Sequence, residues 1–129
     1  MSLPRSIDFA DSGSTNYTHP GGQDLVLLVG PRLQTPKDTS FVVIWFNAMF
    51  GSIAVPTTIT MRVHKGTDNT GAVIGAAQQF SLLTGQTNES IASVVTASAA
   101  MTDYFQVCLS AQAPAGTAIN WATLVCMSF

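Results

Sequence analysis

The sequence predicts an all-β fold, an antiparallel two-sheet sandwich of about eight strands with jelly-roll-like connections. Short runs of β-branched and aromatic residues recur between turn residues, and apolar residues hardly ever recur at the spacing of a helix. The length agrees, since 129 residues suit one domain and are too few for two sandwiches. An immunoglobulin-like sandwich is the alternative, but it prefers a Cys…Trp…Cys spacing, and here Cys108 and Cys126 both lie late in the chain.

Three strands are predicted in the first part of the chain, at Ile7–Phe9, Leu25–Val29 and Phe41–Phe50. The polar stretch after the first strand ends in the turn signal Pro-Gly-Gly, and Gly30-Pro31 is expected to stop the second strand. Residues 1–23 are predicted to form an N-terminal strand or arm with a polar loop, and residues 24–129 the sandwich, within one domain overall. Two forms of the N-terminal segment stay open: an arm ordered only on a partner, or a plain first strand with a long loop.

Five more strands are predicted after Gly51, each bounded by turn residues. They are Thr58–His64, Gln79–Leu83, Ser90–Thr96, Tyr104–Ser110 and Ala118–Phe129. The segment 67–71 between the first two consists of residues that tolerate left-handed backbone, and it predicts a turn. In the last strand the apolar face, where a core is expected, carries Ile119, Trp121, Thr123, Val125, Met127 and Phe129.

Charge is scarce and unevenly distributed. Charged residues make up 9% of the chain, where about 25% is usual for a globular protein. From Asn69 to the end of the chain, the only charged side chains are Glu89 and Asp103. A free monomer normally carries a mixed charged surface, so this neutral half favours packing against copies of itself or a larger assembly. The alternative is a Ser- and Thr-rich β-protein whose hydroxyl groups provide the solvation.

Several classes of partner are not expected. The five basic residues are scattered and form no cationic track for a nucleic acid. The N-terminal sequence MSLPRSIDFADSGS contains no secretory signal, and the longest apolar run is about half of the roughly 20 residues that a membrane helix needs. We therefore expect synthesis in a cytoplasm, no membrane association, and free, buried thiols at Cys108 and Cys126.

No sequence motif indicates catalysis, a cofactor or a metal ion. The only histidines are His19, expected as an ordinary solvated loop residue, and His64, at a predicted strand end. A metal site of His19 with Asp8, Asp11 or Asp24 is one alternative, and a Ser–His–Asp triad is another, but the scarcity of titratable groups disfavours both. We therefore expect a protein that is not an enzyme and that has no cofactor.

Aromatic residues raise the question of sugar binding. Trp45, Trp121, Tyr17 and Tyr104 would have to gather on one surface to form a stacking platform. Both tryptophans lie in strongly apolar strands, and tryptophans in such positions are more often core residues than sugar platforms.

The stretch FVVIWFNAMF, residues 41–50, is apolar on both faces of the predicted strand. Only one face of a sandwich strand can enter the core, and Ile44, Phe46 and Phe50 form the more uniform core face. The opposite face is expected to contact a subunit or a shell, or to be covered by the N-terminal arm. The candidate interface residues are Leu3, Ile7, Phe9, Trp45, Asn47 and Met49.

Two segments of the second half, TITMRVHKGTDNTGAVIG and APAGTAINWATLVCMSF, resemble small jelly-roll virion proteins of tailed bacteriophages. Head decoration (cement) proteins and the β-sandwich tips of fibres are both similar. The resemblance covers roughly Thr57–Phe129. It implies a dimer or trimer, made in the host cytoplasm, that binds the major capsid protein or another virion protein on the outer surface of the capsid. A receptor- or glycan-binding head of a tail fibre, or a carbohydrate-binding module, is the alternative.

Overall fold

The computed structural model describes residues 6–11, 17–34, 41–51, 56–83, 89–98 and 104–129. These ranges contain strands and connecting turns and no helix. The strands are β1 (Ser6–Asp11), β2 (Tyr17–Thr18), β3 (Asp24–Gln34), β4 (Phe41–Phe50), β5 (Thr57–Lys65), β6 (Val73–Leu82), β7 (Glu89–Ser98), β8 (Tyr104–Gln112) and β9 (Ala118–Ser128).

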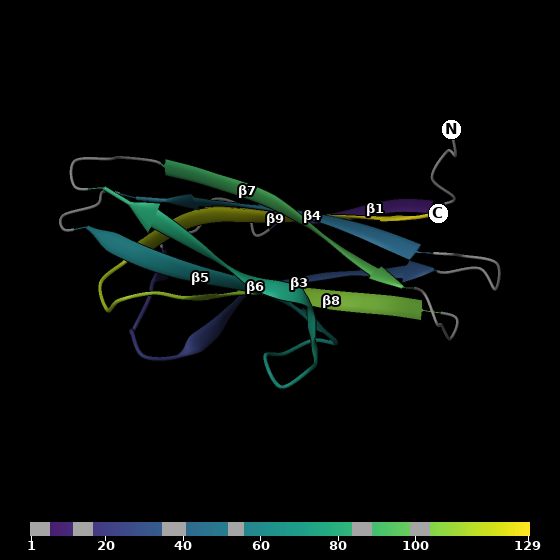
Figure 1. Ribbon diagram of the computed structural model, residues 1–129, viewed down its shortest axis with the longest axis horizontal. Helices are drawn as coiled ribbons and strands as arrows, with labels where there is room; N and C mark the ends of the chain where they lie inside the picture. The colour runs from purple at the N-terminus through teal and green to yellow at the C-terminus, as the bar shows by residue number, and fades with distance from the viewer. Residues whose placement is uncertain (1–5, 12–16, 35–40, 52–55, 84–88, 99–103) are drawn as a thin grey trace.

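The strands form two antiparallel sheets stacked face to face (Figure 1). One sheet has the order β1-β9-β4-β7, with the two-residue β2 also paired to β9, and the other has the order β3-β8-β5-β6. Apart from β2, the eight strands pair first with last, second with seventh, third with sixth and fourth with fifth. A long antiparallel ribbon folded in this way is a jelly roll, so the predicted all-β two-sheet sandwich is confirmed.

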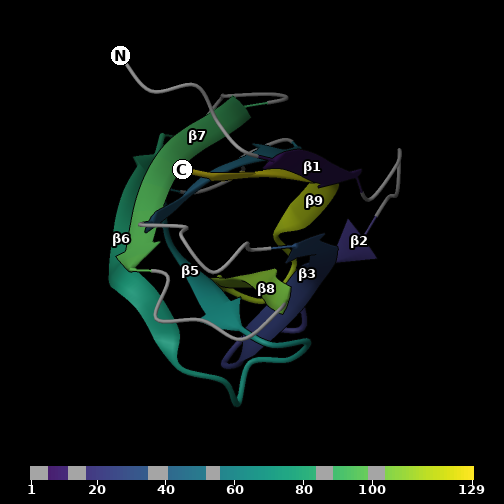
Figure 2. The same ribbon diagram turned by 90° about the vertical axis from the view of Figure 1, so that its right-hand side faces the viewer.

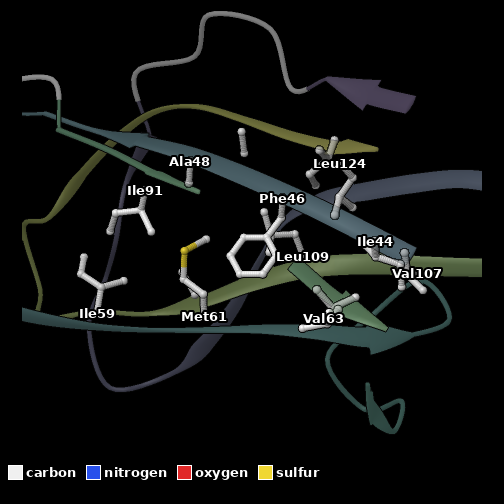
Figure 3. Close-up of a cluster of buried hydrophobic side chains, with 14 of the residues drawn as sticks. Ile44, Phe46, Ala48, Ile59, Met61, Val63, Ile91, Val107, Leu109 and Leu124 are labelled. Carbon is white, nitrogen blue, oxygen red and sulfur yellow. The ribbon is translucent and has the colours of Figure 1, made fainter. Parts of the chain in front are cut away.

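The core lies between the two sheets (Figure 3). From β4 it receives the face with Ile44, Phe46 and Phe50, all buried, as the alternation of residues 41–50 predicts. The facing sheet contributes buried apolar side chains from β5 and β8, namely Ile59, Met61, Val63, Val107 and Leu109.

The expectation that Gly30-Pro31 ends a strand is wrong. β3 continues through both residues to Gln34, with register shifts against β8 between Val26 and Leu28 and between Val29 and Arg32. β3 is an edge strand, so the missing N–H of Pro31 need not interrupt a hydrogen-bonded ladder. Bulges such as these two are common in edge strands. β6 likewise begins at Val73 rather than Gln79, and a bulge against β5 includes Gly75 at φ +67°.

The predicted core face of the last strand is also wrong for most of its length. β9 buries Ala122, Leu124 and Cys126, while Trp121 and Val125 lie half-buried on the outer face. A register shift against β4 explains why Ile119 nevertheless enters the core: Phe50 pairs with Ile119 and Met49 with Trp121, which leaves one extra residue in β9. Because both faces of β9 are apolar, residue type alone does not identify the inner one.

Candidate interaction surface

The outer face of the β1-β9-β4-β7 sheet is an apolar surface that no other part of the described chain covers completely. Trp45 pairs with Val94 on one neighbouring strand and with Val125 on the other, and Val125 in turn pairs with Phe9 through the backbone. The next row joins Ile7, Met127 and Val43. We call the outward side chains of this sheet the apolar face; its described members include Ile7, Phe41, Val43, Trp45, Asn47, Met49, Ala92, Val94, Trp121, Thr123, Val125 and Met127.

Large apolar side chains of this face are strongly exposed. The exposed fraction is 61% for Ile7, 49% for Trp45 and 45% for Val94. Trp45, Val94 and Val125 border an open depression of about 400 Å³ with an apolar lining. Residues 41–50, 90–98 and 118–128 contain no Asp, Glu, Lys, Arg or His, so the centre of the face is also uncharged.

The fold brings most of the predicted interface residues onto this one sheet. Trp45 is exposed, Asn47 and Met49 are half-buried beside it, and Ile7 lies two strands away. Phe9 is placed through its backbone pairing alone, and Leu3 lies outside the described residues. Trp45 and Trp121 both lie on the outer face of the sheet, so the core position expected for Trp121 is wrong.

Sequence reasoning missed Val94 and Val125 as members of the face. The signal that could have identified them is the absence of charge from both strands, combined with apolar residues on each side of the alternation. What was not available without the structure is the strand order, which places β4 between β7 and β9.

The outer face of the β3-β8-β5-β6 sheet is polar. Thr58, Thr60, Arg62, Gln79 and Gln112 line an open groove of about 450 Å³ there. The guanidinium of Arg62 lies 3.4 Å from one carboxylate oxygen of Asp24 and donates to Gln112 at 3.3 Å. The centre of this face is therefore polar, although Val29 and Val73 on its two edge strands are exposed, whereas the centre of the apolar face is uncharged.

His64 is one of the two histidines that the sequence offered as candidates for chemistry. It lies at the centre of a polar cluster on this second sheet. Its Nδ1 lies 3.0 Å from the carbonyl oxygen of Gly71, and because a carbonyl can only accept, Nδ1 carries a proton and donates. Its Nε2 lies 2.8 Å from the Asp24 carboxylate and 2.9 Å from Ser110 Oγ. A neutral ring accepts at Nε2 from the Ser110 hydroxyl, and a protonated ring donates at Nε2 to Asp24.

These three residue types are those of a hydrolase triad, but their geometry differs from that of a triad. In a triad the carboxylate binds one ring nitrogen and the serine the other, whereas here Asp24 and Ser110 share Nε2. Ser110 is completely buried, so its hydroxyl has no access to a substrate. The arrangement is suited to joining strands: Asp24 belongs to β3, Ser110 to β8 and His64 to β5, which are adjacent in that order.

The loop after β5 covers this cluster. Within this loop, the Asp68 carboxylate accepts hydrogen bonds from the Thr70 hydroxyl and, at 2.9 Å, from the backbone N–H of Thr70. These hydrogen bonds lower the pKa of Asp68. Asn69 donates to the carbonyl of Asp24, and the Cys108 thiol donates to the carbonyl of Asp68 at 3.3 Å. Burial under the loop, with a smaller contribution from the nearby Asp68 carboxylate, raises the pKa of Cys108 to about 11.

His19 is fully buried, so the expectation of a solvated loop residue is wrong. Its Nε2 lies 2.9 Å from the carbonyl of Ala111, and its Nδ1 accepts from the backbone N–H of Gly21 at 2.9 Å. Its backbone also exchanges hydrogen bonds with Thr117 and Gly116, which fastens the end of β2 to the β8–β9 turn. Both ring nitrogens are used in these contacts, so His19 has no nitrogen free to bind a metal ion.

Within the described ranges, no group of three or more His, Cys, Asp or Glu side chains could hold a metal ion. Cys108 and Cys126 are buried and form no disulfide, as predicted. The same part of the chain has no helix with the length and hydrophobicity to span a membrane.

Comparison with known proteins gives weak structural similarity alone. No protein-family model and no curated protein sequence matches the chain. The VP2 subviral particle of infectious bursal disease virus is similar with a TM-score of 0.42 and 11% identity, over 96% of this chain and 41% of that one. The infectious bursal disease virus Gx strain gives 0.40 and 13%, over 99% and 39%. Pili from Bacillus endospore appendages give 0.33 and 10%, over 100% and 96%. This chain spans about two fifths of the length of the viral proteins, and its function is therefore inferred from its own two sheet faces.

Proposed function

We propose that this protein is a non-enzymatic structural subunit of a virion, a decoration or cement protein that binds the outer surface of a bacteriophage capsid. The observation that carries the proposal is the apolar face: Ile7, Trp45 and Val94 stand exposed on one sheet whose centre has no charge. A contiguous apolar surface of this kind is the usual mark of a protein–protein contact. The resemblance of residues 57–129 to phage jelly-roll virion proteins supports the same role.

The size of the face fits such a contact. Four strands about 4.8 Å apart and roughly nine residues long at about 3.4 Å per residue cover about 600 Å². A standard interface takes about 800 Å² from each partner, so the apolar face can supply most of one. Because the face is uncharged, binding energy comes from apolar burial, and Trp45 lies where an anchor residue is expected, near the centre.

The experiment is co-sedimentation of the full chain with empty shells assembled from the major capsid protein of the same genome. Trp45→Asp and Ile7→Asp each place a charge on the apolar face, and binding is expected to weaken by about tenfold or more, because the charge loses its hydration at the contact. Thr58→Asp, on the exposed polar face of the other sheet, is the matched control and is expected to bind like the parent protein. A parent chain that stays in the supernatant at saturating shell concentration would contradict the proposal, as would equal binding by all three variants.

A second candidate function, glycan binding, is favoured by the polar groove. Its hydroxyl and amide groups, from Thr58, Thr60, Gln79 and Gln112, are the kind that hydrogen-bond to sugars. A glycan array with the full chain tests it, and Gln112→Ala should abolish any signal that arises in the groove. A signal that survives Gln112→Ala would place the sugar elsewhere.

A further inference from the structure

The backbone of β7 has one hydrogen-bonding edge turned away from β4. Phe41 and Phe129 exchange both backbone hydrogen bonds, at 3.4 and 2.9 Å, so the odd-numbered residues of β4 point to β9 and the even-numbered ones to β7. Phe46 therefore bonds to its β7 partner Ser93, and the residues that point to β4 are the odd ones of β7. The N–H and C=O groups of Ala92, Val94 and Thr96 consequently face away from β4.

This edge lacks the features that protect the other three sheet edges. β1 is short and carries Asp8 and Asp11, β3 carries Pro31 and two bulges, and β6 is interrupted by a bulge at Gly75. β7 instead runs in unbroken register with β4 over ten residues, and it has no charge, proline or glycine from residue 90 to residue 98. Edges of this kind are templates for pairing with another strand.

Strand β6 of the facing sheet lies close to this edge: a Cβ atom at Gly75 would be 3.3 Å from the Val95 side chain, and one β6 side chain partly occupies the edge. Gln78 of β6, the strand beside β7 in Figure 2, donates to the carbonyl of Val94 at 3.4 Å and accepts from the Ser93 hydroxyl. The bond to Val94 is long, and among the described residues it is the one hydrogen bond found to an outward backbone group of β7. The contact confirms that the Val94 carbonyl points outward, and a backbone N–H from another strand would replace it with better geometry.

We infer that β7 pairs with β7 of a second copy, antiparallel and about a two-fold axis at Val94, so that the two sheets become one. Outward-facing residues must meet outward-facing residues, which places Val94 opposite its own copy and Ala92 opposite Thr96. Because residues 90–98 carry no charge, the symmetric pairing brings no like charges together, whereas the six residues of β1 include two carboxylates. It also extends the row of Val125, Trp45 and Val94 across the axis into a single, larger apolar face.

The pairing is tested on the full chain by native mass spectrometry and sedimentation equilibrium, independently of any shell. The parent chain is expected to be a dimer. Thr96→Pro removes an outward N–H without touching the β4 ladder and should weaken the dimer by about tenfold or more, whereas Thr96→Ala keeps the N–H and should leave it unchanged. Circular dichroism and thermal melting confirm that both variants fold.

A charge-swap pair tests the position of the axis. Val94→Lys and Val94→Glu should each be monomeric, because like charges would lie directly opposite, and an equimolar mixture should form the heterodimer. A monomeric parent chain, a Thr96→Pro dimer as stable as that of Thr96→Ala, or a mixture that stays monomeric would each overturn the inference. A dimer lost in Ile7→Asp but kept in Thr96→Pro would show pairing through the apolar face instead. Failure of shell binding with an intact dimer would count against the proposed function alone.

Discussion

The imidazole of His64 lies 2.8 Å from the carboxylate of Asp24, although the two residues belong to strands that are not neighbours in their sheet. β8 lies between them, and its residue Ser110 shares the same imidazole nitrogen at 2.9 Å. A single buried ring thus connects three strands, and through Gly71 it also holds the loop that covers them. In a chain with 9% charged residues, this cluster concentrates polar contacts at the point where three strands and a loop meet.

Replacing His64 by leucine should destabilise the fold. The change leaves the partly buried Gly71 carbonyl without its partner and removes one of two partners from the Asp24 carboxylate, which costs about 1–3 kcal/mol of unfolding free energy. Urea denaturation monitored by circular dichroism measures the loss. Thr58→Ala, on an exposed position of the same strand and face, is the control and should change stability by less than about 0.5 kcal/mol. Equal effects of the two substitutions would show that the cluster is not stabilising.

Trp45 and Phe46 are neighbours in the chain with opposite environments, and their truncation should separate stability from association. Phe46 is 3% exposed in the core, so Phe46→Ala should cost about 3–5 kcal/mol. Trp45 is 49% exposed, so Trp45→Ala should cost less than about 1 kcal/mol in the isolated chain while weakening shell binding. Thermal unfolding and co-sedimentation of both variants make the comparison. A Trp45→Ala loss as large as that of Phe46→Ala would mean that the tryptophan belongs to the core.

How well the sequence predicted each strand depends on the residue pattern of that strand. β4 is predicted to the residue, because its ten residues, all apolar except Asn47, are bounded by turn signals. Its core face is right because Ile44, Phe46 and Phe50 are more uniform than the other side. β9 fails in its face assignment because it is apolar on both sides, and the inner face depends on a bulge that only the pairing with β4 reveals. β3 fails at its end because the effect of Pro31 depends on whether a strand lies at a sheet edge.

The histidines show a different limit. Their burial arises from loops that fold back over the sheets, and such contacts join residues far apart in the chain, such as His19 with Ala111. The residues next to His19 and His64 in the sequence carry no signal that predicts these long-range contacts. The candidate surface was accessible to sequence reasoning through Trp45, Asn47 and Met49, since an apolar second face on a sandwich strand has to meet something.

Gly71 is a position where any side chain should disturb the loop over His64. A Cβ atom at this residue would lie 1.7 Å from the carbonyl oxygen of Lys65, a distance at which the backbone has to move. Gly71→Ala should therefore lower stability and expose Cys108, which lies under the same loop. Hydrogen exchange of residues 65–72 and alkylation of Cys108 measure the opening. Thr67→Ala, at an exposed site in the same loop, is the control, and a Gly71→Ala protein with unchanged exchange would contradict the close approach.

The thiol of Cys108 should be almost unreactive in the folded protein. Burial, and to a smaller extent the nearby Asp68, raises its pKa to about 11, so at pH 8 about one thiol in a thousand is ionised. Alkylation by iodoacetamide in a Cys126→Ala background, with and without urea, measures this, and reaction of the native protein at the rate of a free thiol would contradict it. Because the folded pKa lies above the unfolded value of about 8.5, the thiol favours folding below that pH, and the contribution is lost as the pH rises toward 11. The Cys126→Ala protein should therefore lose more stability over this range than the Cys108→Ala/Cys126→Ala protein, whose unfolding free energy lacks this term.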